Sequence, residues 1–369
     1  MSSTGSGVGL AVRLGVALWA AVGCGGGEDS YEGPRVDVSV MTRNLYLGAD
    51  ISNVLLAPSV DAVPDLAAAF WAEVLRSDFP ARAKLLAEEV ALHAPDLLAL
   101  QEVEIYRRQS PSDFATVPGV NASEVVLDFL AILQAELAAR GLTYVVAVQN
   151  VLSDVELPVR LGTELVDLRM TDRDVTLAKP GVLVSGATTT VFTNYLTVNV
   201  GGAAGPRVEI RRGYSTVETV ASSGAGTARF TFGNAHLEVG GLLQSFQEAQ
   251  ADELVERLRP VAGPVLLLGD FNSAADRSST RSYGFLRTLF RDPWENVRPG
   301  DPGYTCCVDL AAGDPAALDS RIDLVLTRGD VAARGPALVG LPARTPGGLT
   351  ASDHLGVVMT LSLVPDAAR

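Results

Sequence analysis

Residues 265–272 read Val-Leu-Leu-Leu-Gly-Asp-Phe-Asn, an apolar run that ends in an acid and an amide two positions apart. The apolar run is typical of a β-strand buried on both faces. Side chains at positions i and i+2 of a strand point the same way, so Asp270 and Asn272 are expected to face one site at the edge of a sheet. An acid and an amide delivered together suit a hard cation, a water to be activated or a phosphate oxygen. The alternative is a strand followed by an Asx-type turn, since Asp and Asn also dominate turns.

Polar side chains also mark the ends of other expected strands. The residues concerned, each beside an apolar β-like run, are Asn44, Glu102, His236, Asp323, Asp353 and His354. A soluble fold has little reason to place so many acids and imidazoles at the ends of apolar strands, so we interpret them as one site. The chain has three histidines, and two belong to this set. The third, His93, lies on an expected helix face and is interpreted as packed or solvated.

The rest of the chain predicts helices and strands within a single domain. Asp78 followed by Pro80 indicates a helix start, because a side-chain acceptor and a proline are both favoured in that position. An apolar stripe predicts another helix over residues 123–140. The Val-, Thr- and Gly-rich region 150–232 predicts successive strands and hairpins. No internal repeat or interior linker interrupts residues 36–365, so we expect one domain there.

The first two dozen residues are expected to be a targeting segment outside the fold. Residues 1–23 have one Arg before an apolar segment that is too short to span a bilayer, the layout of a secretory signal. Cys24 then resembles the lipidated cysteine of a bacterial lipoprotein signal, with residues 24–35 as a flexible tether. We therefore expect an exported cell-envelope lipoprotein that is attached to a membrane through its N-terminal lipid. An ordinary cleaved signal is the alternative, and it would give a secreted protein.

The composition limits which partners the surface attracts. The chain has 47% hydrophobic residues and a formal net charge of −14, so a large core and an acidic surface are expected. Such a surface repels nucleic acid and anionic lipid unless cations or a local basic groove intervene. Arginines are concentrated between residues 160 and 212, which offers such a local excess. Apart from Cys24, the cysteines are the neighbours Cys306 and Cys307, which form either a vicinal disulfide or buried thiols, and no spacing suggests structural zinc.

The order of these motifs resembles that of the endonuclease/exonuclease/phosphatase superfamily. The segments that carry the resemblance are Thr-Arg-Asn at 42–44, Gln-Glu at 101–102, Asn-Ala-His-Leu at 234–237, Gly-Asp-Phe-Asn at 269–272, Arg-Ile-Asp-Leu-Val-Leu at 321–326 and Ser-Asp-His at 352–354. The superfamily includes deoxyribonuclease I-like nucleases, abasic-site endonucleases, inositol-polyphosphate phosphatases and bacterial sphingomyelinases. The resemblance implies a four-layer α/β sandwich, in which two mixed β-sheets pack face to face with helices outside.

The resemblance also implies a divalent-metal site. Glu102 would be the principal metal ligand, with Asn44 beside it and Asp353 nearby. Oxygen ligands favour Mg²⁺, or else Mn²⁺ or Ca²⁺, over zinc. His354 would act with the attacking water, and Asp323 would hold its ring and stabilise the imidazolium.

Further roles follow from the same resemblance. Asp270 and Asn272 would orient the water and a phosphate oxygen, and His236 would donate to the phosphate. An arginine is expected to add a charge clamp, and the candidates are Arg173, Arg212 and Arg321. Residues 180–230 are expected to be an insertion near the mouth of the site.

The implied function is hydrolysis of a phosphodiester by a divalent-metal-dependent enzyme of nuclease type. The alternatives are a phospholipid or sphingomyelin phosphodiesterase and an inositol-phosphate phosphatase. The expected partner is therefore a phosphodiester substrate, either nucleic acid or a phospholipid headgroup, and no obligate protein partner is indicated. A non-enzymatic binding protein that keeps the fold is a third hypothesis, against which the intact set of acids and histidines argues.

Overall fold

The apolar run 265–268 lies in the middle of a sheet. In the computed structural model, which describes residues 31–117 and 119–369, strand β12 (Val265–Asp270) runs parallel to β11 (Gly226–His236) and antiparallel to β13 (Asp323–Arg328). All six residues of β12 are buried, as the sequence pattern predicts for a strand covered on both faces. The expected signal peptide and Cys24 lie outside the described residues.

Two large mixed sheets organise residues 33–369, which form one compact unit. The strands of the larger sheet, in spatial order, are β14 (Val331–Val339), β15 (Gly356–Leu363), β1 (Val36–Asn44), β2 (Leu97–Gln101), β6 (Glu164–Ala178), β3 (Ile105–Gln109) and β4 (Glu124–Asp128), and β5 (Val145–Leu161) also pairs with β6. The strands of the second sheet are β13, β12, β11, β10 (Gly213–Ser223) and β7 (Leu183–Val191). A separate two-stranded ribbon consists of β8 (Leu196–Asn199) and β9 (Arg207–Ile210).

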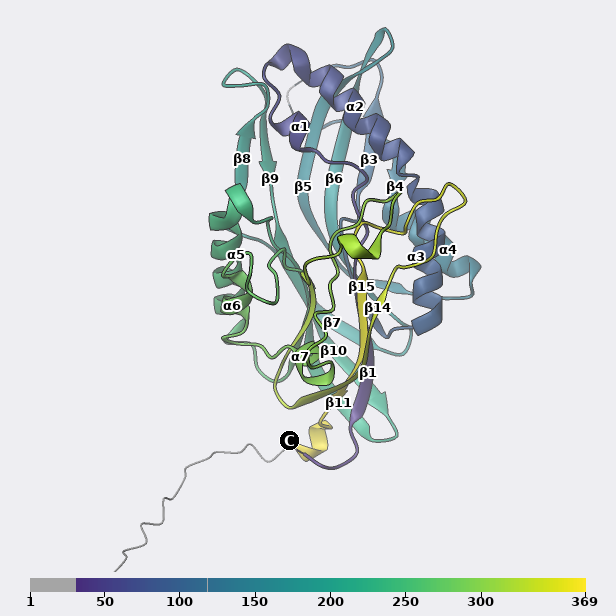
Figure 1. Cartoon of the computed structure of the whole chain (residues 1–369), viewed down its shortest axis with the longest axis vertical. Helices are drawn as coiled ribbons and strands as arrows, with labels where there is room; N and C mark the ends of the chain where they lie inside the picture. The colour runs from purple at the N-terminus through teal and green to yellow at the C-terminus, as the bar shows by residue number, and fades with distance from the viewer. Residues whose placement is uncertain (1–30, 118) are drawn as a thin grey trace, which may run out of the picture. The chain divides into compact units, whose positions relative to one another are not determined.

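Helices cover the outer faces of both sheets. The helices are α1 (Ser52–Leu55), α2 (Val63–Arg76), α3 (Phe79–His93), α4 (Phe129–Ala139), α5 (Gln244–Leu258), α6 (Ser282–Leu286) and α7 (Pro293–Val297). Helices α2, α3 and α4 lie together on one side of the domain, and α5 and α6 lie on the other (Figure 1). None of the helices in the described segments is long and apolar enough to cross a membrane.

Three apolar clusters hold the four layers together. The central cluster joins the inner faces of the two sheets and includes Val38 of β1 and Phe232 of β11. A second cluster packs α2, α3 and α4 against the larger sheet, and a third packs α5 and α6 against the second sheet. The architecture therefore confirms the predicted sandwich of two mixed sheets with helices outside.

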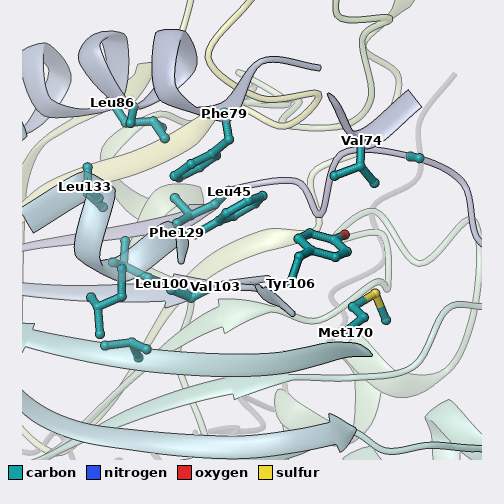
Figure 2. Packing of buried hydrophobic residues seen from close by; sticks show 14 of the residues in the cluster. Leu45, Val74, Phe79, Leu86, Leu100, Val103, Tyr106, Phe129, Leu133 and Met170 are labelled. Carbon is teal, nitrogen blue, oxygen red and sulfur yellow. The ribbon is translucent and has the colours of Figure 1, made fainter. Parts of the chain in front are cut away.

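Aromatic residues fill the layer between the larger sheet and its helices (Figure 2). Phe79 of α3 stacks on Phe129 of α4, with ring centroids 3.6 Å apart. Tyr106 of β3 packs beside both Phe129 and Trp71 of α2 and donates a hydrogen bond to Leu47 O at 2.7 Å. That bond ties the core to the loop after β1, where the first polar residues of the site are found.

The start of α3 agrees with the sequence, whereas the start of α4 does not. The side chain of Asp78 accepts a hydrogen bond from Ala81 N at 3.2 Å, as expected of an N-cap. The helix predicted over 123–140 begins only at Phe129, because residues 124–128 form the edge strand β4, which pairs with β3. Asp128 caps α4 by accepting from two backbone N–H groups, and β-branched residues before it favour the strand.

Region 150–232 consists of strands, as predicted, but the expected insertion at 180–230 does not stand apart from the fold. Strands β7 and β10 belong to the second sheet, and only β8 and β9 form a separate ribbon. A sequence pattern shows that a segment is extended, but the partner of a strand depends on residues far away in the chain.

Candidate active site

Strand register brings the predicted residues to one edge of each sheet. In the second sheet, Asp270 lies opposite His236 on one side and opposite Asp323 on the other. In the larger sheet, Asn44 pairs with Gln101, so that Glu102 follows directly beyond the end of β2. Parallel pairing places the ends of neighbouring strands together, which is why motifs so far apart in sequence meet.

A glycine permits the close approach of β11 and β12. Gly269 has a φ of +152°, and a Cβ at this position would collide with the carbonyl oxygen of Ala235. The motif therefore needs glycine directly before Asp270. Tyr46, Glu102 and Asn272 have positive φ values of 61°, 53° and 49°, so strained backbone gathers at these strand ends, as is common in functional sites.

The two sheets are joined at the site by side-chain hydrogen bonds. Asn44 Nδ2 donates to Glu102 Oε1 at 3.2 Å and to Asp270 Oδ2 at 3.0 Å, connecting the two sheets. Glu102 Oε2 accepts from Leu47 N at 2.6 Å. Asn234 adds a buried cross-link, because its Nδ2 donates to Leu100 O at 3.1 Å and its Oδ1 accepts from Gln101 Nε2 at 2.7 Å. The acidic residues are thus held by fixed polar contacts.

His354 and Asp323 form a buried acid–imidazole pair. His354 Nδ1 lies 2.9 Å from Asp323 Oδ2 and 3.8 Å from Asp270 Oδ2. Burial by itself lowers the pKa of His354, but the charges of Asp323, Asp270 and Asp353 outweigh it and raise the pKa well above the usual value. His354 is therefore a cation at neutral pH when these carboxylates are charged.

His236 is held in the opposite charge state. Its Nδ1 lies 3.2 Å from Arg212 Nη1, which can only donate, so Nδ1 accepts and the ring proton is on Nε2. Burial, together with the charges of Arg212 and His354, lowers the pKa of His236 well below its usual value. Nε2 lies 3.7 Å from Asp270 Oδ2 and 3.4 Å from Asn272 Nδ2, and the latter amide makes its shorter bond, at 3.0 Å, to Leu237 O. His236 is thus a neutral donor next to an imidazolium.

The candidate arginines occupy different places. Arg212 lies at the site and donates to Asp172 Oδ2 at 3.3 Å as well as to His236. Arg173 is buried and committed to the fold, because it donates to Val103 O at 2.8 Å and to Asp128 Oδ1 at 2.7 Å. Arg321 donates to Asp292 Oδ2 and to Pro302 O, and it stacks over Trp294. Of the three arginines, Arg212 is the one that contacts the histidine of the site.

The remaining predicted residues lie around this centre. Asn272 N donates to Asp270 Oδ1 at 2.9 Å, and its side chain donates to Leu237 O at 3.0 Å. Asp353 is half-buried, and its carboxylate accepts from Ser352 Oγ at 3.3 Å. His93, in the last turn of α3, is half-buried.

Segment 305–308 braces the loop that carries His354. Thr305 Oγ1 accepts from Asp323 N at 3.2 Å, and Leu355 N donates to Thr305 O at 2.7 Å. Cys306 and Cys307 are joined as a vicinal disulfide, one of the two alternatives that the sequence left open.

Sequence reasoning missed a group of buried acids around Arg212. Its members are Glu104, Asp172, Asp174 and Glu238, each at most 4% exposed. Burial raises the pKa of Asp172 to about 6, against the opposing charge of Arg212, and it raises the pKa values of Glu104 and Asp174 further. The sequence does contain a signal for three of them. Asp172 and Asp174 are two residues apart on β6, and Glu104 lies two residues after Glu102, a spacing that directs side chains of an extended segment to the same side.

Burial also sets the proton affinity of Asp270. It raises the pKa of Asp270 to about 7, with the His354 charge opposing the rise and the Asp323 charge adding to it. A carboxyl that titrates near neutral pH is suited to accept a proton from a bound water.

A pH-dependent stability follows for the protein freed of metal by chelation. Asp270 has a folded-state pKa near 7 against an ordinary value of 3.8, so its favourable contribution to the free energy of unfolding is complete below about pH 4 and is lost as pH rises through 7. Relative to Asp270→Asn, the free energy of unfolding of the wild type should fall over this range by up to about 1.4 kcal/mol per pH unit. Urea unfolding at several pH values measures the difference. Asp276→Asn, at an exposed aspartate, is the control and should show no such fall. If the unfolding free energies of the wild type and Asp270→Asn differ by the same amount at every pH, the raised pKa of Asp270 is contradicted.

The chemistry of the donor set fits a hard divalent cation. Asp270 and Asp323 each have a carboxylate oxygen within 4.8 Å of the other and of a ring nitrogen of His354, but the imidazolium of His354 has no lone pair for a metal, so the carboxylates are the candidate donors. Asp323 Oδ1 is buried without a hydrogen-bond partner among residues 31–117 and 119–369. Glu102 is half-buried and is connected to Asp270 through Asn44, so its carboxylate belongs to the same group of acids. Oxygen donors of this kind favour Mg²⁺, Mn²⁺ or Ca²⁺.

A sandwich of two mixed sheets, with acids and histidines gathered at the ends of its strands, is an arrangement typical of hydrolases. Residues 74–354 match the Endonuclease/Exonuclease/phosphatase family. This match spans more than half of the chain, so the protein belongs to that family and is a hydrolase of the phosphoesterase or nuclease type. A comparison with curated protein sequences gives no match.

Solved structures share the fold at low sequence identity. An endonuclease/exonuclease/phosphatase from Beutenbergia cavernae is 23% identical with a TM-score of 0.52, and the match covers 89% of this chain and 72% of that one. A family protein from Bacteroides thetaiotaomicron is 14% identical with a TM-score of 0.55, covering 89% of this chain and 99% of that one. A humanized D. rerio TDP2 with 14 mutations is 16% identical with a TM-score of 0.50, covering 88% and 98%. At these identities the likeness concerns the fold.

Proposed function

We propose that this protein is a divalent-metal-dependent phosphodiesterase of nuclease type. The observation that carries the proposal is the continuous chain of contacts from Glu102 through Asn44 and Asp270 to His354. Glu102, with Asn44 and Asp353, would hold the cation. When bound, the cation supplies positive charge that stabilises the phosphate oxygens as the ester is cleaved.

The protein's own groups divide the remaining work. Asp270 orients the attacking water and takes its proton, since its pKa lies near 7. His354, held cationic by Asp323, stabilises the negative charge that develops on the phosphate. His236 donates from Nε2 to a phosphate oxygen, and Arg212 keeps its ring in that tautomer. A P–O bond forms to the water oxygen, whose proton goes to Asp270, and the ester P–O bond breaks. The ester oxygen takes up a proton from solvent and leaves as an alcohol, and Asp270 returns its proton to solvent.

The arginines of region 160–212 are paired with acids, which bears on the choice of substrate. Arg160 pairs with Asp65 at 2.7 Å, and Arg169 pairs with Asp154 at 2.6 Å. Arg211 pairs with Glu209. Because this local excess of positive charge is neutralised, a polyanionic substrate would depend on the bound cation and on Arg212 for its attraction, and binding should weaken as salt rises.

A substrate panel tests the proposal. Purified protein is incubated with supercoiled plasmid DNA, sphingomyelin vesicles and an inositol phosphate, each with Mg²⁺ and with EDTA. We expect plasmid nicking that EDTA abolishes and added Mg²⁺ restores. Release of choline phosphate, or of inorganic phosphate from the monoester, without nicking would replace the nuclease assignment by the corresponding alternative. Silence on all three substrates would favour the non-enzymatic hypothesis.

A further inference from the structure

A second cluster of acids lies away from the candidate active site. One carboxylate oxygen from each of Asp113, Glu156 and Asp167 lies within 4.8 Å of the other two. Asp113 belongs to the loop after β3, Glu156 to β5 and Asp167 to β6. Asp167 precedes Asp172 by five residues on β6, so this cluster and the acids around Arg212 are separated by about 16 Å along the strand.

Two buried oxygens at the cluster have no partner in the described part of the chain, although Asp167 itself accepts from Ser112 Oγ and, at 2.9 Å, from Asp113 N. Glu156 is 5% exposed; its Oε2 accepts from Asn121 N and Ala122 N, both at 2.8 Å, but its Oε1 has no hydrogen-bond partner among the residues described. This oxygen belongs to one of the three carboxylates of the cluster, so it is available to bind a cation there. Asn121 Nδ2 donates to both oxygens of Asp113, at 3.2 and 3.1 Å, while the buried Oδ1 of the same amide is also without a partner in the described part of the chain. Turning this amide over would direct an oxygen toward the acids.

Among the described residues, the negative charge of the cluster is offset only by hydrogen bonds and by the more distant charge of Arg169, which acts on Glu156. In the described ranges none of the three carboxylates takes part in an ion pair, and Asp167 is fully buried. Arg169 is the nearby cation, but it is held by Asp154 through bonds of 2.8 and 2.6 Å. Buried carboxylates require a partner charge or a metal. Glu156 and Asp167 are buried, Asp113 is half-buried, and Glu156 Oε1 is without a partner in the described part of the chain, so the three carboxylates point to a cation.

We propose that Asp113, Glu156, Asp167 and Asn121 form a Ca²⁺ site. Every donor is an oxygen, as Ca²⁺ prefers, and three carboxylates with one amide form a ligand set built by the protein, whereas Mg²⁺ is usually held by one or two carboxylates and several waters. Glu156 lines a cavity of about 470 Å³ and Asp113 lines a neighbouring one of about 520 Å³, so water reaches the ion to complete its coordination. The ion ties the loop after β3 to the hairpin of β5 and β6. It is independent of the proposed catalytic cation.

Thermal unfolding in the presence of constant excess MgCl2 tests this site, because the proposed catalytic centre is then kept supplied with its own cation. Adding CaCl2 to 100 times its dissociation constant should raise the Tm of the wild type by roughly 4 °C. Glu156→Gln keeps the shape of the side chain but removes the charge, and it should abolish the rise. Glu124→Gln, at an exposed glutamate of β4 that pairs with Arg108 of β3, is the matched control and should keep the whole rise.

The outcomes separate this proposal from that of the catalytic function. Phosphodiesterase activity of Glu156→Gln in MgCl2 should stay within about two-fold of the wild type, whatever its substrate. If circular dichroism shows that Glu156→Gln is unfolded, Asp113→Asn in the half-buried loop takes its place. No Ca²⁺-dependent rise in the wild type, or an equal rise in wild type and variant, overturns the site. A rise lost only in the cluster variants supports it.

Discussion

Replacing His354 with alanine should lower the rate of phosphodiester hydrolysis by roughly 10²–10⁴-fold, the range expected when a group that acts on the transition state is removed. The cationic ring is held by Asp323 at 2.9 Å and lies 3.8 Å from Asp270. Its loss removes the charge that stabilises the phosphate and leaves two acids repelling each other. Steady-state kinetics on the best substrate of the panel, with saturating Mg²⁺, measure the effect, which should fall mainly on kcat.

His93→Ala is the matched control for that experiment. His93 is the histidine outside the cluster, in the last turn of α3, and its removal should change the rate by less than about two-fold. Equal rates for His354→Ala and the wild type would contradict the role of His354. An equal loss in both variants would instead indicate a general effect of losing an imidazole.

Replacing Arg82 with methionine should have the largest effect on stability. Arg82 is fully buried, and burial lowers its pKa to about 10, which leaves it charged at neutral pH. Its guanidinium donates to four backbone carbonyls, those of Leu45, Tyr46, Ser77 and Ala351, at 2.6–3.0 Å. Methionine fills similar space but leaves these acceptors unpaired, so the free energy of unfolding should fall by roughly 3–5 kcal/mol. Urea unfolding followed by circular dichroism measures the change.

Arg76→Met provides the comparison for Arg82. Arg76 is 72% exposed in its side chain and pairs with Glu73 on the same helix at 3.2 Å, so its loss should cost less than about 0.5 kcal/mol. Similar unfolding free energies for the two variants would contradict the role given to Arg82. Since Arg82 holds the loops that follow Asn44 and precede His354, the folded fraction of Arg82→Met should also have reduced activity.

Much of the site could be predicted because its residues lie at strand ends. Asp270, His236 and Asp323 each follow or begin an apolar run, and the polar interruption of such a run is visible without knowing its neighbours. The period of two further predicts that Asp270 and Asn272 share a side of the chain. The structure places all of them, with Glu102 and His354, in one network of contacts.

Sequence patterns could not predict the partners of the arginines or the pairing of strand β4. Arg173 and Arg212 are equally plausible clamps in sequence, yet Arg173 is bound to Val103 O and Asp128 whereas Arg212 contacts His236. The apolar residues of β4 also fit a helical stripe, so the sequence pattern predicts a helix there, whereas the pairing of β4 with β3 depends on residues outside the segment. A long side chain has many possible partners, and packing chooses among them.

The amino-acid sequence by itself determined the strand ends and the identity of the acids and histidines, because burial periodicity and turn chemistry are local properties; the class of fold followed from the family resemblance that the ordered motifs carry. Tertiary structure alone decided that Arg212 contacts His236 and that burial raises the pKa of Asp172. It also decided that the carboxylates of Asp113, Glu156 and Asp167 lie close together. The physical reason is that charge interactions depend on distance and burial, and both are set only when strands remote in sequence pair and the two sheets close on each other.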